Sequence, residues 1–163
     1  MRFVLSIQFL LLTFLAAANA QTPRIDRIEI TEAGIYQRGN IVSDPTRGND
    51  AMIDSAKLVK STTTIPARIG TTFGFRGKLV GQPSGGKITL KKVTRFPPPG
   101  IRNSVTGQMQ MSEDENIIGS IGAEFFTDGR FDDPDDMIPG NWVMEIWYEN
   151  QKLAQQQFMV VKP

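Results

Sequence analysis

The sequence contains no cysteine and no histidine. Their absence excludes Ser-His-Asp and Cys-His nucleophile systems, and it excludes zinc, haem and iron–sulfur sites built from these residues. It also excludes disulfides and a lipid-bearing cysteine behind a signal peptide. The side chains that remain for catalysis are carboxylates, lysine, tyrosine, serine and threonine. We therefore expect no enzyme activity, no metal site and no cofactor.

A charge excess of either sign is also missing. Lysine and arginine total 18, and aspartate and glutamate total 17. Without Arg2, which lies in the N-terminal segment described next, each sign counts 17 and the formal net charge is zero. Proteins that bind polyanions carry a basic excess, so nucleic acid is not an expected partner.

The first twenty residues have the pattern of a secretory signal peptide. Arg2 precedes an apolar run from Phe3 to Phe14, and the segment ends in the small-x-small pattern Ala18-Asn19-Ala20. The run is too short for a membrane span, and no later run approaches that length. We expect cleavage after Ala20 and a single soluble domain, residues 21–163, that works in the periplasm or outside the cell without a lipid anchor.

The rest of the chain alternates apolar and polar residues, as β-strands do, and turn residues separate the alternating segments. The segments are 24–31, 71–80, 87–96, 105–111, 117–127, 141–149 and 153–161. This pattern predicts an all-β fold, an antiparallel immunoglobulin-like β-sandwich of about seven to nine strands. Residues 33–64 are predicted to form a long loop, in which 51–60 is either an extra strand or a short helix.

Several local features predict details of the strands. A phase shift at Val93 predicts a β-bulge at Lys91-Lys92. Met109 and Met111 fall on the apolar side of their segment and are expected in the core. The short link between the last two segments predicts a hairpin, with Asn150 at a position of positive φ.

Trp147 alternates out of phase with Trp142 and shares its face with Glu145 and Glu149. If Trp142 lies in the core, Trp147 is either an exposed aromatic of a binding surface or is covered by a loop from residues 33–64. Glu145 and Glu149 are expected to form a solvated stripe rather than an acid–base pair. The pair Glu113 and Glu115 offers the same carboxylate chemistry, but no cleft is evident around it.

The segment 128–136 is rich in carboxylates that suit Ca²⁺, namely Asp132, Asp133, Asp135 and Asp136. Its spacing is not that of an EF-hand loop, and solvated Asp-Pro turns are common between strands, which favours a plain loop. The triplet Pro97-Pro98-Pro99 is expected to stop a strand, with a rigid recognition strip as the alternative.

Short motifs along the chain carry a resemblance to a known family. They are Ile28-Glu29-Ile30, Gly34-Ile35-Tyr36, Thr64–Ala67, Gly70–Gly74, Arg95-Phe96-Pro97, Pro139–Trp142, Ile146-Trp147 and Phe158-Met159-Val160. In combination they resemble the domain-of-unknown-function 3859 (DUF3859) family of exported bacterial proteins. The resemblance implies an all-β domain of unassigned activity and supplies no catalytic residues.

Elimination and the strand pattern together favour a non-enzymatic module that binds a protein or another component of the cell envelope. Its first expected contact is Trp147 with its face neighbours, and its second is the loop 96–100. The alternative is a module that binds a small ligand or Ca²⁺ through the acidic segment 128–136.

Overall fold

The computed structural model of the chain describes residues 22–39, 41–43, 51–53, 56–103 and 105–163. The predicted signal peptide, residues 1–20, lies outside the described residues. Within them the chain folds into strands and one short 3-10 turn, which confirms the predicted all-β class. No helix in these ranges is long and apolar enough to cross a membrane.

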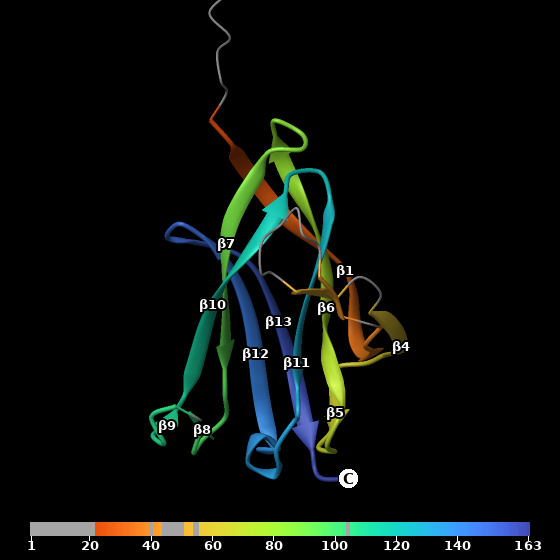
Figure 1. Cartoon of the computed structure of the whole chain (residues 1–163), viewed down its shortest axis with the longest axis vertical. Helices are drawn as coiled ribbons and strands as arrows, with labels where there is room; N and C mark the ends of the chain where they lie inside the picture. The colour runs from red at the N-terminus through yellow and green to blue at the C-terminus, as the bar shows by residue number, and fades with distance from the viewer. Residues whose placement is uncertain (1–21, 40, 44–50, 54–55, 104) are drawn as a thin grey trace, which may run out of the picture.

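Two sheets form the body of the molecule (Figure 1). One sheet consists of β1 (Arg24–Gln37), β4 (Lys57–Ser61), β6 (Thr72–Gln82) and β11 (Glu124–Arg130). The other consists of β5 (Thr64–Pro66), β7 (Lys87–Arg95), β10 (Ser112–Ser120), β12 (Gly140–Tyr148) and β13 (Gln151–Val161). The strand orders are β11-β6-β1-β4 and β10-β7-β12-β13-β5. Because β5 runs parallel to β13, the five-stranded sheet is mixed rather than purely antiparallel.

Two short ribbons accompany the sheets. β2 (Ile41–Ser43) pairs with β3 (Ala51–Ile53), and β8 (Ile101–Arg102) pairs with β9 (Met109–Gln110). The 3-10 turn η2 (Pro134–Asp136) connects β11 to β12. In Figure 1 the β8–β9 ribbon lies at one end of the sandwich, near the bottom of the view.

The segment 33–64 is more regular than the predicted long loop. Its beginning belongs to β1, and its second half supplies β3, β4 and β5, so the strand alternative for 51–60 is correct. Two described residues near its middle contact the outer face of the four-stranded sheet. Arg38 binds the Asp128 carboxylate, with Nη2 at 2.8 Å from Oδ2, and the backbone oxygen of Ala56 accepts a hydrogen bond from Arg76. These two contacts place Arg38 and Ala56 against the four-stranded sheet.

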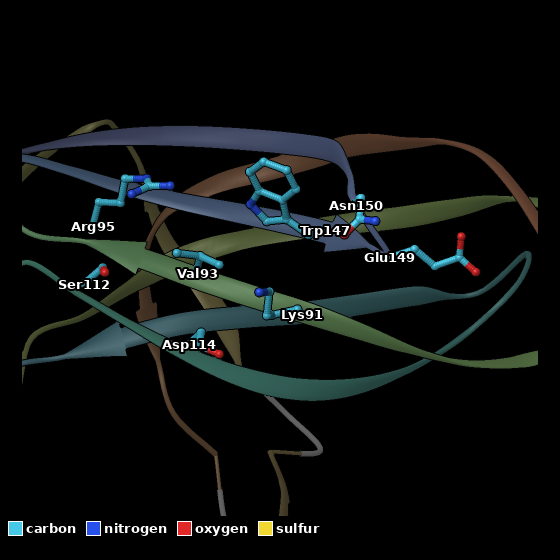
Figure 2. Close-up of a pocket in the computed structure, with 8 residues that line it drawn as sticks. All are labelled: Lys91, Val93, Arg95, Ser112, Asp114, Trp147, Glu149 and Asn150. Atoms are coloured by element: carbon cyan, nitrogen blue, oxygen red, sulfur yellow. The ribbon is translucent and has the colours of Figure 1, made fainter.

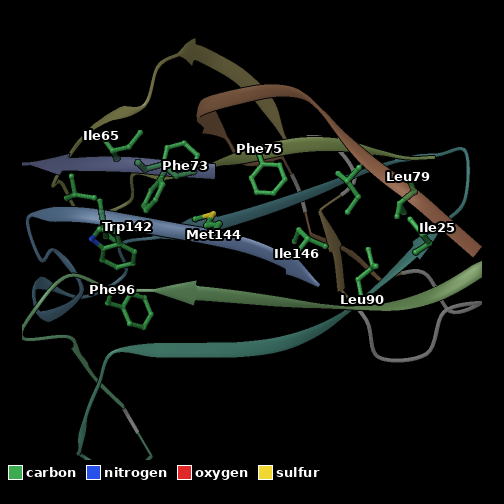
Figure 3. Close-up of a cluster of buried hydrophobic side chains, with 14 of the residues drawn as sticks. Ile25, Ile65, Phe73, Phe75, Leu79, Leu90, Phe96, Trp142, Met144 and Ile146 are labelled. Atoms are coloured by element: carbon green, nitrogen blue, oxygen red, sulfur yellow. The ribbon is translucent and has the colours of Figure 1, made fainter. Parts of the chain in front are cut away.

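The hydrophobic core fills the space between the two sheets (Figure 3). Every second residue of the main strands points into it, as the sequence alternation predicts. The fully buried side chains include Ile65, Phe73, Phe75, Leu79, Leu90, Ile121, Phe131, Met144, Ile146, Phe158 and Val160. This burial of apolar surface is the main favourable term for the fold.

An aromatic cluster forms one end of the core. The ring of Phe73 lies 5.2 Å from Phe131, 5.8 Å from Trp142 and 5.3 Å from Phe158, measured between centroids. The pairs with Trp142 and Phe158 are edge-to-face, and pairs of this kind contribute about 0.5–1.5 kcal/mol each beyond the area that they bury. Phe96 packs on Trp142 at 4.8 Å and is itself buried, so its ring is not available as the predicted second contact for a partner.

The C-terminal hairpin confirms the strongest local prediction of the sequence. β12 pairs with β13 from Gly140–Val160 to Tyr148–Gln151. The residue with positive φ is Glu149, at 51°, rather than the predicted Asn150. The prediction was wrong because it placed the turn one residue too late; β12 already ends at Tyr148, so Glu149 is the first residue of the turn.

The bulge predicted at Lys91-Lys92 is absent. β7 keeps an unbroken register with β10, in which Lys91 faces Asn116 and Lys92 faces Glu115, and an unbroken register with β12. The apolar phase shifts because Lys92 itself points inward. Its amine bonds to Glu115 Oε1 and to the backbone oxygen of Asp128, both at 2.6 Å. These two bonds satisfy a lysine that is only 7% exposed.

The alternation predicted that Met109 and Met111 lie in the core, but the structure places both at the surface. Their exposed fractions are 50% and 49%, and that of Val105 is 91%. The reason is that this segment forms the β8–β9 ribbon at the end of the sandwich instead of a full strand of either sheet. Its alternation therefore has no second sheet to face.

The proline triplet follows β7 after one intervening residue, Phe96, and forms the predicted strand stop. The Gly100 N–H donates a hydrogen bond to the Pro97 oxygen at 2.8 Å, which closes the turn, and Gly100 adopts a φ of 90°. Pro97 is buried. It packs so closely on Gly140 that a Cβ at Gly140 would lie 2.6 Å from Pro97 Cβ.

Phe73→Ala tests the aromatic cluster. Loss of the Phe73 ring should lower the free energy of unfolding by about 3–5 kcal/mol, because the ring is fully buried and its neighbours cannot close the cavity. Urea titration of the purified protein measures this. Val59→Ala, at a side chain that is 63% exposed on β4, is the control and should change stability by no more than about 0.5 kcal/mol. Equal effects of the two substitutions would contradict the assignment of the core.

Candidate functional site

Strand β12 places Trp147 on the outer face of the five-stranded sheet. Trp142, Met144 and Ile146 point into the core and are at most 5% exposed. The alternation of the strand therefore directs Glu145 and Trp147 to the opposite side. Trp147 is half-buried there. The described residues of the 33–64 segment that contact a sheet face do so on the other sheet, so the covering loop considered for Trp147 is not found among them.

Glu145 is buried on this outer face, which corrects the expectation of a solvated stripe. Its exposed fraction is 4%, whereas Glu149, in the turn, is exposed. Three side chains cover the Glu145 carboxylate and bind it. Oε2 accepts hydrogen bonds from Trp147 Nε1 at 3.0 Å and from Arg95 Nε at 3.3 Å, and Oε1 accepts one from Lys152 Nζ at 3.1 Å.

The charge of Glu145 is stabilised by these partners. Desolvation alone raises the pKa of a buried carboxyl, but the hydrogen bonds from Trp147, Lys152 and Arg95 outweigh it and hold the pKa of Glu145 below its ordinary value. The partners come from three strands: Arg95 from β7, Trp147 from β12 and Lys152 from β13. We call Glu145 with these three residues the Glu145 cluster.

The Glu145 cluster also fixes the position of the Trp147 ring. The indole N–H points to Glu145, and Lys152 Nζ lies 5.9 Å from the ring centroid, within the range of a cation–π contact. Lys152 is itself held by Gln155 Oε1 at 2.7 Å. An aromatic side chain held in this way loses little conformational entropy when something binds to it.

Beside Trp147 the outer face carries an open groove of about 350 Å³ (Figure 2). It runs over three neighbouring strands, β10, β7 and β12, and reaches the β12–β13 turn. Its lining residues are Lys91, Val93, Arg95, Ser112, Asp114, Trp147, Glu149 and Asn150. We call this hollow the Trp147 groove.

The Trp147 groove contains charges of both signs in equal number. Lys91 and Arg95 are basic, and Asp114 and Glu149 are acidic. Figure 2 shows the Asp114 and Glu149 carboxylates pointing in different directions from opposite parts of the groove. A second hollow of about 490 Å³ adjoins it at the turn and shares Glu149 and Asn150 with it.

The acidic segment 128–136 does not gather its carboxylates around one point. Asp128 binds Arg38, and Asp132 binds Arg130 at 2.6 Å. Asp136 Oδ2 accepts the backbone N–H groups of Asp132 at 3.3 Å and Asp133 at 3.0 Å, which caps the η2 turn. Among the described residues, no group of three or more acidic side chains is arranged to hold a metal ion.

A second charged cluster lies between β10 and β11 and joins the two sheets. Lys92 connects Glu115 of β10 to the backbone of Asp128 on β11. Burial raises the pKa of the nearby Glu113, and the charge of Lys92 only partly counteracts this. The sequence identifies Glu113 and Glu115 as a pair but does not identify Lys92. The phase shift at Val93 predicts a bulge, whereas in the structure the shift arises because Lys92 points inward.

Comparison with known proteins agrees with this architecture. The family model described as Domain of unknown function (DUF3859) matches residues 25–160. The structure is similar to the crystal structure of an immunoglobulin-like protein from Pseudomonas aeruginosa, with 23% sequence identity and a TM-score of 0.61 over 88% of this chain and 99% of that chain. None of the curated proteins compared with the chain matches it. The immunoglobulin-like sandwich predicted from the sequence is thereby confirmed.

Glu145→Gln tests the cluster through pH. Because the folded-state pKa of Glu145 is lowered, the carboxylate stabilises the fold at neutral pH, and this contribution is lost as the pH falls below about 4.5. At pH 7 the free energy of unfolding of the variant should therefore be about 1–2 kcal/mol lower than that of the native protein. This difference should shrink towards pH 3. Urea titrations at several pH values measure it. Glu149→Gln, in the exposed turn, is the matched control; a gap for Glu145→Gln that is independent of pH would contradict the assignment.

Proposed function

The chain belongs to the DUF3859 family, and we propose that it is a non-enzymatic binding module that works outside the cytoplasm and holds a cell-envelope component in the Trp147 groove. One observation carries the proposal. The half-buried Trp147 lies beside an open groove, and on this outer face of the sheet the buried Glu145 carboxylate accepts a hydrogen bond from the indole N–H. The proposal that it acts outside the cytoplasm rests on the signal-peptide pattern of residues 1–20.

The energetics of the Glu145 cluster support a role in binding. Removing a carboxylate from water is costly, and even a well-paired buried ion pair contributes little net stability. A buried ion pair is therefore weak evidence for a purely structural role of Glu145. What Glu145 adds is a fixed direction for Trp147 and Arg95, the two largest side chains that line the groove.

The chemistry of the groove supports binding rather than catalysis. The sequence has no histidine or cysteine to act as base or nucleophile at neutral pH. The two carboxylates that line the groove, Asp114 and Glu149, do not face one another in Figure 2, whereas a glycosidase needs two that converge on one bond.

Site-specific crosslinking in intact cells tests the proposal. A photo-reactive amino acid at Ser112, on the wall of the groove, should capture one envelope component in high yield. The same amino acid at Ser61, an exposed serine on β4 of the other sheet, is the matched control and should not capture it. Mass spectrometry of the adducts identifies what is captured.

Trp147→Ala in the Ser112-labelled protein completes the test. Tryptophan at the centre of an interface is a frequent hot spot, so its loss should reduce capture at least about tenfold while the protein stays folded. Capture that is equal from Ser112 and Ser61, or that persists without Trp147, would overturn the proposal.

A further inference from the structure

We infer that the Trp147 groove accepts a neutral glycan chain, with one sugar ring lying against the indole of Trp147. The inference rests on the proposed function and names the class of ligand. It is argued from the charge balance of the groove, its hydrogen-bonding groups, the Trp147 ring and the position of the groove on the sheet.

The charge balance favours a neutral ligand. Two basic and two acidic side chains line the groove, so neither a polyanion nor a polycation gains a net attraction from it. Arg95 is in addition partly neutralised by Glu145, with Nη2 at 3.3 Å from Oε2. Asp114 would repel phosphorylated or sulfated ligands, and Lys91 would repel strongly basic peptides.

The hydrogen-bonding groups of the groove suit hydroxyl groups. Lys91 and Arg95 only donate hydrogen bonds, and Asp114 and Glu149 only accept them. A hydroxyl both donates and accepts, so a ligand rich in hydroxyls can satisfy both kinds of group along its length. Ser112 and Asn150 both donate and accept, and they complete the set.

Trp147 supplies the apolar surface that a sugar ring needs. A pyranose has one face of C–H groups, which packs on an aromatic ring. Figure 2 shows the broad face of the Trp147 ring turned to the same side of the sheet as Arg95 and Lys91. The bond from the indole N–H to Glu145 holds this surface in place before the ligand arrives.

The position of the groove favours a glycan over an extended peptide. The groove lies over β10, β7 and β12, of which β7 and β12 are hydrogen-bonded to strands on both sides and β10 is an edge strand of the sheet. A peptide lying over β7 and β12 cannot pair with their backbone and would find free strand partners only along β10.

NMR of the two tryptophan indoles in the folded protein tests the inference. The probes are the neutral oligosaccharides tetra-N-acetylchitotetraose and maltotetraose, titrated to millimolar concentration. The Trp147 indole signal should shift with at least one of them. The Trp142 indole, which is 5% exposed and bonded to the Ile138 oxygen at 2.9 Å, should not shift and reports that the fold is intact.

Two matched variants locate the site. Asp114→Asn should weaken binding about tenfold, because it removes a charged hydrogen-bond acceptor from the groove wall. Asp135→Asn, at an exposed aspartate of η2, should leave affinity unchanged. Equal affinities of the two variants would overturn the site.

The absence of any Trp147 shift with both oligosaccharides would overturn the glycan inference, as would equal shifts of both indoles, which indicate non-specific binding. If crosslinking from Ser112 nevertheless captures a polypeptide in a Trp147-dependent way, the groove is a protein-binding site. The proposed function then stands while the glycan inference fails.

Discussion

Strand β12 has to bury Trp142, Met144 and Ile146 between the two sheets. Because successive side chains of a strand point to opposite faces, this requirement directs the residues between them to the outer face. Glu145 and Trp147 are sent to the outer face by the same alternation that builds the core. A slip of one residue in register would expose the core residues to water. The packing of Trp142 in the aromatic cluster around Phe73 therefore also fixes the positions of the β12 side chains that line the groove. Stability and the candidate site therefore depend on one constraint, the phase of β12.

The protein has two charged networks, which differ in position and in role. Lys92 lies between the sheets and bonds to both β10 and β11, where it closes the side of the sandwich. Glu145 lies outside the sheet and bonds to residues of three adjacent strands. The first network joins elements of the fold. The second orients side chains that face solvent, which is why we place the function there.

Period-two alternation was sufficient to predict the fold class, the core position of Trp142 and the C-terminal hairpin. It failed where a charged residue points inward or an apolar residue points outward. Lys92 was mistaken for a bulge, and Met109 was placed in a core that does not extend to its ribbon. The Glu145 cluster could not be predicted, because Arg95 and Lys152 are brought to Glu145 only by the pairing of β7 and β13 with β12. Trp147 was identified from the sequence, whereas its fixed orientation was not.

Side-chain ¹⁵N relaxation of the two indoles, in the native protein and in Glu145→Gln, is the most direct measurement of the central claim that Glu145 holds Trp147 in place. The account predicts that both indoles are rigid in the native protein, with order parameters of roughly 0.85. In the variant the Trp147 indole should become mobile, with a value below about 0.6, while the buried Trp142 indole stays rigid. A Trp147 indole that is equally mobile in both proteins would contradict the account.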